Sequence, residues 1–243
     1  MSARNVSILR ILERSQFAIL LACLLGLFLV QPMMPLRPNG EERIGADTAL
    51  AAVLLACLWS VKRRRSAMLA GFVLIAGALA AVWFAHIAPS RPAILAALLV
   101  ALAAMLFTVG SLLWHVVQEK QVGTDTILGG ICVYFLLGCA WAMIYSLVEQ
   151  LQPGSLSAAS GTLFRPDQAG TLLVPDLLYY SVFVLTTIGP QEVHPISSAA
   201  RAWTGVEAMT GQLFLVIFIS RLVGLHGASP SSDGSSSRSD GAE

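Results

Sequence analysis

The stretch that decides the fold lies late in the chain, where residues 175–189 read PDLLYYSVFVLTTIG. Pro175 stands where the first residue of a helix would be, and Asp176 follows in the first turn, so this point favours a helix start. From Pro175 to Thr186 the chain offers about twelve helix-compatible residues, which span roughly 18 Å before Gly189-Pro190 stops the helix. That is half a bilayer. The pattern therefore predicts a re-entrant helix and loop in a membrane.

The orientation of such a half-helix has an electrostatic consequence. If it enters from outside, its C-terminal carbonyl groups point to the membrane centre and carry about half a negative charge. Several such ends on one axis would stabilise a cation. The alternative is a helix and loop packed against neighbours, with Tyr179, Tyr180 and Phe183 as ordinary core aromatics. These residues alone leave both interpretations open.

The composition around this stretch is that of a membrane protein. Of 243 residues, 56% are hydrophobic and 12% are charged, and the mean hydropathy is +0.74, far from the soluble average. We expect an all-α integral membrane protein with six transmembrane helices. The first apolar stretch is short, so its helix either begins earlier or runs on through Met33-Met34. The six predicted spans lie near residues 17–30, 48–61, 67–87, 92–117, 127–148 and 203–225.

The basic residues predict the topology, because Lys and Arg near span ends stay on the cytoplasmic side. The cytoplasmic group consists of Arg4, Arg10, Arg14, Lys62, Arg63, Arg64, Arg65, Lys120, Arg221 and Arg238. The opposite group is Arg37, Arg43, Arg91, Arg165 and Arg201. We therefore expect a multi-pass cell-membrane protein with both termini in the cytoplasm.

The basic run at residues 62–65 could instead bind nucleic acid. Charges beside a span are, however, typical topology anchors. The net charge of +1 also argues against a nucleic-acid partner.

The first four predicted spans look like a scaffold domain, residues 1–121. They carry almost no ionisable residue at membrane depth, which argues against a proton relay or a coupled transporter. The span at 94–117 lacks the repeated Arg of a voltage sensor, so steep voltage gating is not expected. Residues 226–243 are rich in Ser, Gly and Asp and predict a disordered cytoplasmic tail.

Residues 179–189, YYSVFVLTTIG, resemble the pore helix and filter entry of the potassium-channel superfamily, with its paired aromatics, Ser-Val and Thr-Thr-Ile-Gly. Residues 211–214, GQLF, and 220–224, SRLVG, are similar to the inner helix of bacterial two-transmembrane-type pore modules. The resemblance covers about 125–225. It implies a pore domain over 122–225, with outer helix, pore helix, filter and inner helix, in a six-transmembrane homotetramer.

The resemblance also assigns an ion pathway. In the family, a TVGYG-like loop offers carbonyl oxygens that replace the hydration shell of the ion. This chain has TIGPQE at 187–192, so Thr187, Ile188 and Gly189 would hold a permeating cation. The filter and pathway residues implied are Thr186, Thr187, Ile188, Gly189, Pro190, Gln191 and Glu192.

The outer half of this filter departs from the family pattern. Pro190 fixes φ near −65°, removes a backbone donor and restricts Gly189 before it. Gln191 replaces the second filter glycine, whose left-handed conformation would cost a Gln roughly 1–2 kcal/mol. Glu192 keeps an acid at the acidic position, so four copies would form a carboxylate ring that concentrates cations. The alternative for Glu192 is a solvated rim without a role.

The inner helix offers further positions. Glu207 is the most unexpected residue, because an acid at membrane depth normally faces the protein interior with a partner. Thr210 and Gln212 are candidates for cavity lining or for hydrogen bonds between helices. Gly211 could bend the helix or let another approach, and close packing is the favoured interpretation.

We therefore expect passive conduction of monovalent cations, K⁺ and Na⁺, with reduced K⁺ selectivity and weak voltage dependence. The expected partners are further copies of the chain and membrane lipid; no cofactor and no enzymatic activity are expected. One alternative is a non-conducting channel relative that serves as a membrane scaffold or sensor. A second is a small transporter.

Overall fold

The computed structural model describes residues 16–33, 53, 65–88, 90–119, 123–158, 174–189 and 192–227. Of the second predicted span, only Val53 is described. Pro190, Gln191 and residues 228–243 of the predicted tail also lie outside the described residues.

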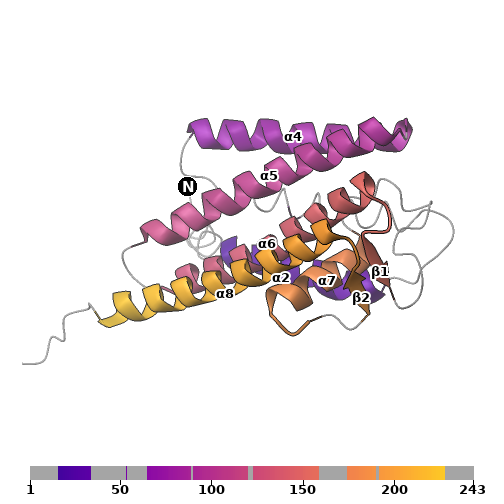
Figure 1. Cartoon of the computed structure of the whole chain (residues 1–243). Helices are drawn as coiled ribbons and strands as arrows, with labels where there is room; N and C mark the ends of the chain where they lie inside the picture. The colour runs from indigo at the N-terminus through magenta and orange to yellow at the C-terminus, as the bar shows by residue number, and fades with distance from the viewer. Residues whose placement is uncertain are drawn as a thin grey trace, which may run out of the picture.

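Six helices and two short strands form the described part of the chain (Figure 1). In chain order they are α2 (Gln16–Met33), α4 (Arg65–Ile87), α5 (Arg91–Gln118), α6 (Thr124–Leu151), β1 (Leu156–Ala158), α7 (Pro175–Leu185), β2 (Val193–Pro195) and α8 (Ser198–Gly227).

Within the described residues, three helices are long and apolar enough to cross a membrane: Arg91–Gln118, Thr124–Leu151 and Ser198–Leu225. Shorter apolar stretches occupy Phe17–Leu29 of α2 and Leu69–Ala85 of α4. The expectation of an all-α membrane protein is confirmed. The count of six spans stays a prediction.

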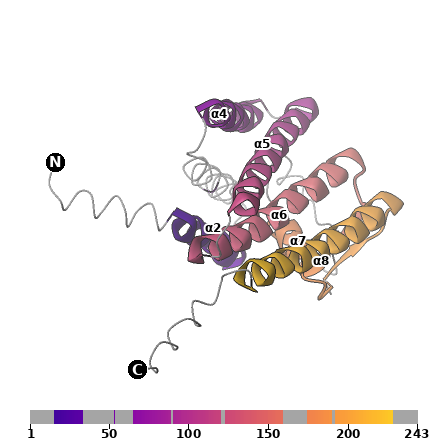
Figure 2. The same ribbon diagram turned by 90° about the vertical axis from the view of Figure 1, so that its left-hand side faces the viewer.

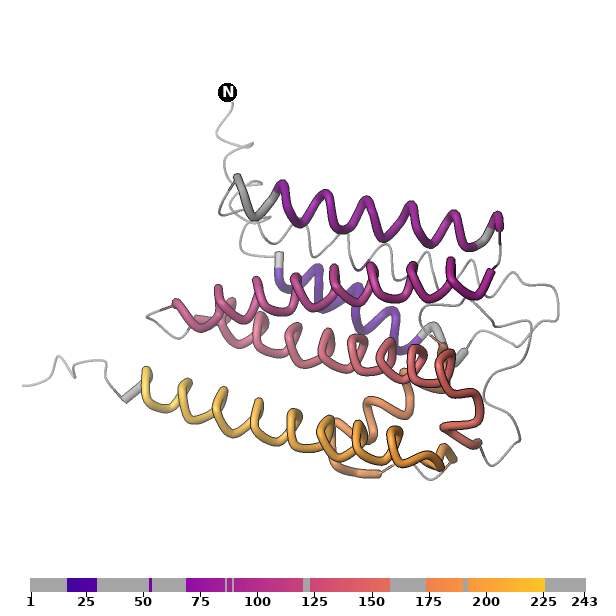
Figure 3. Tube along the Cα trace, turned by 45° about the horizontal axis from the view of Figure 1, so that its top comes forward, coloured from indigo at the N-terminus to yellow at the C-terminus, as the bar shows by residue number. Residues whose placement is uncertain are grey.

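Consecutive helices pack against each other, with α4 beside α5 and α5 beside α6 (Figure 2). Helix α2 also packs against α6. The short α7 lies between α6 and α8 and contacts both. Figure 3 shows the long helices running side by side along the body of the molecule. Helix α6 is therefore central to the packing, because it contacts α2 and α5 on one side of the chain order and α7 and α8 on the other.

Local sequence explains where these helices begin. Helix α5 has Pro92 in its first turn, and α7 begins at Pro175, a position where the missing N–H of proline costs nothing. Helix α6 has Asp125 in its first turn, close to the positive end of the helix dipole. Helix α6 contacts four of the other described helices, and its side chains Cys132, Leu136, Cys139 and Met143 are buried in the core.

The two strands are a feature that the sequence analysis did not predict. They pair antiparallel, with Leu156 opposite Pro195 and Ala158 opposite Val193. The pair joins the segment that follows α6 to the segment that follows the filter region. It therefore holds both ends of the loop that contains α7.

Candidate functional site

The pore helix α7 has the length that the sequence predicted. It runs for eleven residues from Pro175 to Leu185, and the chain then turns sharply. The Thr186 amide donates to the Val182 carbonyl at 2.9 Å, and the Thr187 amide donates to the Val184 carbonyl at 2.9 Å. The helix thus ends in a tight, hydrogen-bonded turn instead of continuing across the membrane.

The residues of this turn have unusual backbone conformations. Thr187 has φ of 59° and Gly189 has φ of 81°. The left-handed region costs a residue with a side chain roughly 1–2 kcal/mol, so the surrounding contacts must hold Thr187 there. Thr187, Ile188 and Gly189 are all exposed. No donor among the described residues is hydrogen-bonded to the carbonyls of these three residues.

The inner helix α8 reaches this turn through Gln212. Its Nε2 donates to Thr187 Oγ1 at 3.0 Å, and that hydroxyl in turn donates to the Thr186 carbonyl at 2.7 Å. Thr210 instead donates to the Val206 carbonyl of its own helix. Of these two polar residues of the inner helix, only Gln212 is brought to the predicted filter.

Gly211 lies where α7 and α8 approach most closely. A Cβ atom at this position would overlap the Leu185 carbonyl oxygen. Tyr134 of α6 donates its hydroxyl to the same oxygen at 2.9 Å. The last carbonyl of the pore helix is thus fixed from two sides.

Glu207 lies behind the pore helix and does not face the turn. Its side chain is fully buried, with Oε2 2.5 Å from the Tyr145 hydroxyl and Oε1 2.5 Å from Ser181 Oγ. Beside it, Tyr180 bonds Thr204 at 2.6 Å. These buried hydrogen bonds join α6, α7 and α8.

Glu192 is exposed and directly precedes β2. The position of Glu192 depends on the β1–β2 pair, and that pair is hydrogen-bonded to α6. The Glu149 carboxylate accepts hydrogen bonds from the Gly154 and Leu156 amides at 2.6 and 3.1 Å, so it fixes the turn between α6 and β1. Glu192 is thereby held beside a short strand pair that is anchored to α6.

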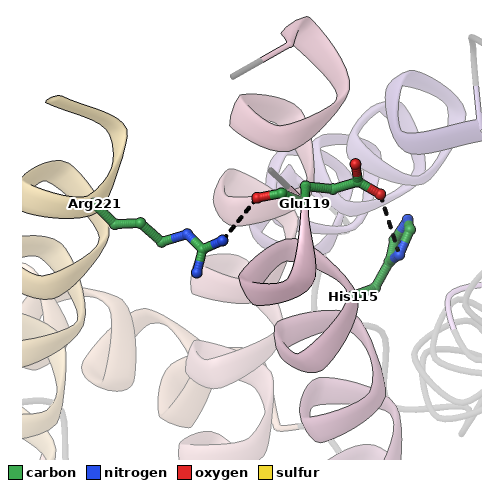
Figure 4. A network of polar contacts seen from close by, with 3 residues as sticks. All are labelled: His115, Glu119 and Arg221. Carbon is green, nitrogen blue, oxygen red and sulfur yellow. Dashed lines mark hydrogen bonds and ion pairs between the residues drawn. The ribbon is translucent and has the colours of Figure 1, made fainter. Parts of the chain in front are cut away.

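Near its C-terminal end, α8 is hydrogen-bonded to the residue that follows α5. Arg221 Nη2 donates to the Glu119 carbonyl at 2.8 Å, and the Glu119 carboxylate lies 3.8 Å from His115 Nδ1 (Figure 4). Glu119 directly follows α5. Helix α8 is therefore tied to the end of α5 near its own C-terminus and to the turn after α7 at its middle.

Comparison with protein families bears on this arrangement. Residues 154–225 match the family model described as "Ion channel". These residues are thus similar to the pore module of an ion channel. The match begins two residues before β1 and ends in α8, so it includes α7, the turn that follows it and most of α8. Comparisons with curated proteins and with solved structures give no match.

The match confirms the resemblance to a potassium-channel-like pore module, over a shorter range than the expected 125–225. The roles of single residues in the pore module stay predictions. Sequence reasoning missed four residues that position it: Tyr134, Tyr145, Glu149 and Ser181. Tyr134, Gly138 and Tyr145 recur at spacings of four and seven, which place them on one face of a helix, and this signal was available in the sequence.

Proposed function

We propose that the chain forms a homotetrameric channel for monovalent cations, with residues 186–192 lining the ion path. The observation that carries the proposal is the half-length helix α7, which ends in an exposed turn whose carbonyls at Thr187, Ile188 and Gly189 have no donor among the described residues. Such oxygens are the groups that replace water around a cation in a filter. The negative end of the α7 dipole adds to this attraction.

The exposure of the turn supports assembly around an axis. Non-helical backbone at membrane depth is stable only where protein buries it or where it lines a water-filled path. Ile188 is 71% exposed in a single chain, and one re-entrant segment cannot enclose a path. Four copies would cover the apolar side chain and leave the carbonyls facing the axis.

The inner helix supports the same assembly. Of the most apolar 18-residue stretch of α8, only 6% is buried in the single chain, whereas 61% of the corresponding stretch of α6 is buried. Exposed large apolar side chains run along it at Trp203, Val206, Met209, Leu213, Val216 and Ile217. In the proposed tetramer, neighbouring subunits and lipid share this surface.

We further propose reduced K⁺ selectivity and weak voltage dependence. Pro190 and Gln191 replace the residues that complete the outer carbonyl ladder in the family, so fewer dehydrating sites remain. Arg91 is the only Lys or Arg in α5, and charge that moves through the membrane field is what gives steep voltage dependence. The distribution of Lys and Arg among the loops supports a cytoplasmic position for both termini.

The test is flux of K⁺ and Na⁺ from liposomes that contain the purified protein, with empty liposomes as the baseline. A channel gives passive flux that does not saturate at low ion concentration. Absence of flux would favour a non-conducting scaffold or sensor, and saturable, coupled uptake would identify a transporter.

A matched pair of variants links the flux to the turn. Gly189→Ala places a side chain at φ of 81° and should lower the flux, because the left-handed conformation is strained for alanine. Gly205→Ala is the control, since no atom lies within 4 Å of its added Cβ. Equal flux from both variants would place the ion path elsewhere.

A further inference from the structure

The buried polar groups around Glu207 make more short contacts than the hydrogens of the neighbouring hydroxyl groups can bridge. Ser181 Oγ lies 2.5 Å from Glu207 Oε1 and 2.8 Å from the Gly138 carbonyl oxygen. Both neighbours are acceptors if Glu207 is ionised. A serine hydroxyl has one hydrogen, so it can bond only one of them and would turn a lone pair towards the other.

One further hydrogen resolves the arrangement. If Glu207 Oε1 carries a proton, it donates to Ser181 Oγ, and Ser181 donates to the Gly138 carbonyl. Tyr145 supplies its own hydrogen to Glu207 Oε2 at 2.5 Å. Every short contact then has one donor and one acceptor, and the hydrogen bonds run without a break from α8 through α7 to α6.

Among the described residues, no positive charge lies beside Glu207 to hold an ionised carboxylate. The titratable groups that face it are tyrosines: Tyr134 and Tyr145 from α6 and Tyr180 from α7. Within the described part of the chain, no Lys or Arg is paired with it. A buried charge without a partner is strongly unfavourable, and such a group usually neutralises.

We propose that Glu207 is a neutral carboxylic acid whose hydrogen-bonded chain through Ser181 to Gly138 positions the pore helix. Ser181 stands near the middle of α7, so the chain fixes the rotation of the helix about its axis. That rotation sets the direction in which the turn at Thr187 leaves the helix. Glu207 is thus a positioning residue and not a ligand of the permeating ion, and only this last consequence rests on the proposed channel function.

The protonation state is tested directly by infrared spectroscopy of the purified protein with isotope-labelled glutamate carboxyl groups. At neutral pH we expect a carbonyl band of a protonated carboxyl group that shifts with the label and is lost in Glu207→Gln. Ser181→Ala gives a second assignment, because loss of the acceptor should move the band without removing it. Absence of a protonated-carboxyl band from the wild-type protein would overturn the proposal. This readout needs no ion conduction, so it stands apart from a failure of the proposed function.

The positioning role is tested by comparing two replacements in the liposome assay. The Glu207→Gln amide donates to Ser181 and accepts from Tyr145, so flux and tetramer yield should stay within about twofold of the wild type. Glu207→Ala breaks the chain and should lower both. A large loss of flux in a Glu207→Gln protein that still assembles would mean that the negative charge itself is needed, and would contradict a neutral acid.

Discussion

The side-chain amide of Gln212 in the inner helix lies 3.0 Å from the hydroxyl of Thr187 in the turn after the pore helix. This hydrogen bond is a direct link between α8 and the predicted filter. Thr187 holds a left-handed conformation with φ of 59°, and Gln212 is one of the contacts that keep it there. A movement of the inner helix would therefore reach the filter without passing through the pore helix.

Replacement of Gln212 by Leu should lower flux while leaving assembly intact. One lost hydrogen bond is worth about 0.5–1.5 kcal/mol, equivalent to a factor of about two to ten in the population of the conducting turn. Thr210→Val is the control, since among the described residues the Thr210 hydroxyl bonds the Val206 carbonyl of its own helix and does not reach the turn. Wild-type flux from Gln212→Leu would mean that other contacts hold the turn.

The close approach of α7 and α8 makes a prediction about stability. Gly211→Ala would push its Cβ into the Leu185 carbonyl oxygen, and overpacking of this kind costs about 1–3 kcal/mol. Gly205→Ala in the same helix meets no atom within 4 Å and should be neutral or stabilise by up to about 1 kcal/mol. Thermal unfolding in mild detergent measures both. Equal unfolding temperatures would show that the helices do not meet at Gly211.

The exposed carboxylate of Glu192 should matter most at low salt. If four copies surround the outer mouth, they concentrate cations there, and the effect is screened within roughly 8 Å at physiological ionic strength. Glu192→Gln should therefore lower single-channel conductance at low salt and change it little at high salt. His194→Gln, at an exposed position of β2, is the neutral comparison. An unchanged low-salt conductance would place Glu192 away from the ion path.

The rewritten outer filter predicts weak discrimination between K⁺ and Na⁺. Reversal potentials under bi-ionic conditions should give a permeability ratio well below that of an ordinary potassium channel, with Na⁺ passing readily. The double change Pro190→Tyr with Gln191→Gly removes the ring constraint and a left-handed penalty of about 1–2 kcal/mol per subunit, and should raise the preference for K⁺. Strong K⁺ selectivity of the unmodified protein would contradict this account.

The pore helix was predictable because local chemistry sets its ends. Pro175 starts it, and the sequence expectation of an end near Thr186 differs by one residue from the observed Leu185. The membrane class follows as directly from composition. Such features depend on short-range geometry and on apolar content, which a single sequence carries in full.

The supports of the pore segment were not predictable in the same way. The pairing of Leu156 with Pro195 joins residues that are distant in the chain, and neither three-residue strand has an alternating pattern long enough to reveal it. Glu207 was expected to face the protein interior with a partner. Its particular partners, Ser181 and Tyr145, depend on how three helices pack, and no local pattern encodes that.

We propose that ions pass along the turn at Thr187, and cysteine accessibility tests this ion path most directly. Thr187→Cys places a thiol of similar size in the proposed path, and Trp114→Cys places one on the exposed surface of α5 as the control. A cationic thiol-reactive methanethiosulfonate reagent is added during current recordings in planar bilayers, with the wild-type protein as the baseline. We predict rapid, irreversible block of Thr187→Cys currents and no block of the wild type or of Trp114→Cys. Thr187→Cys currents that persist although the thiol is modified would show that the ion path does not run past this residue.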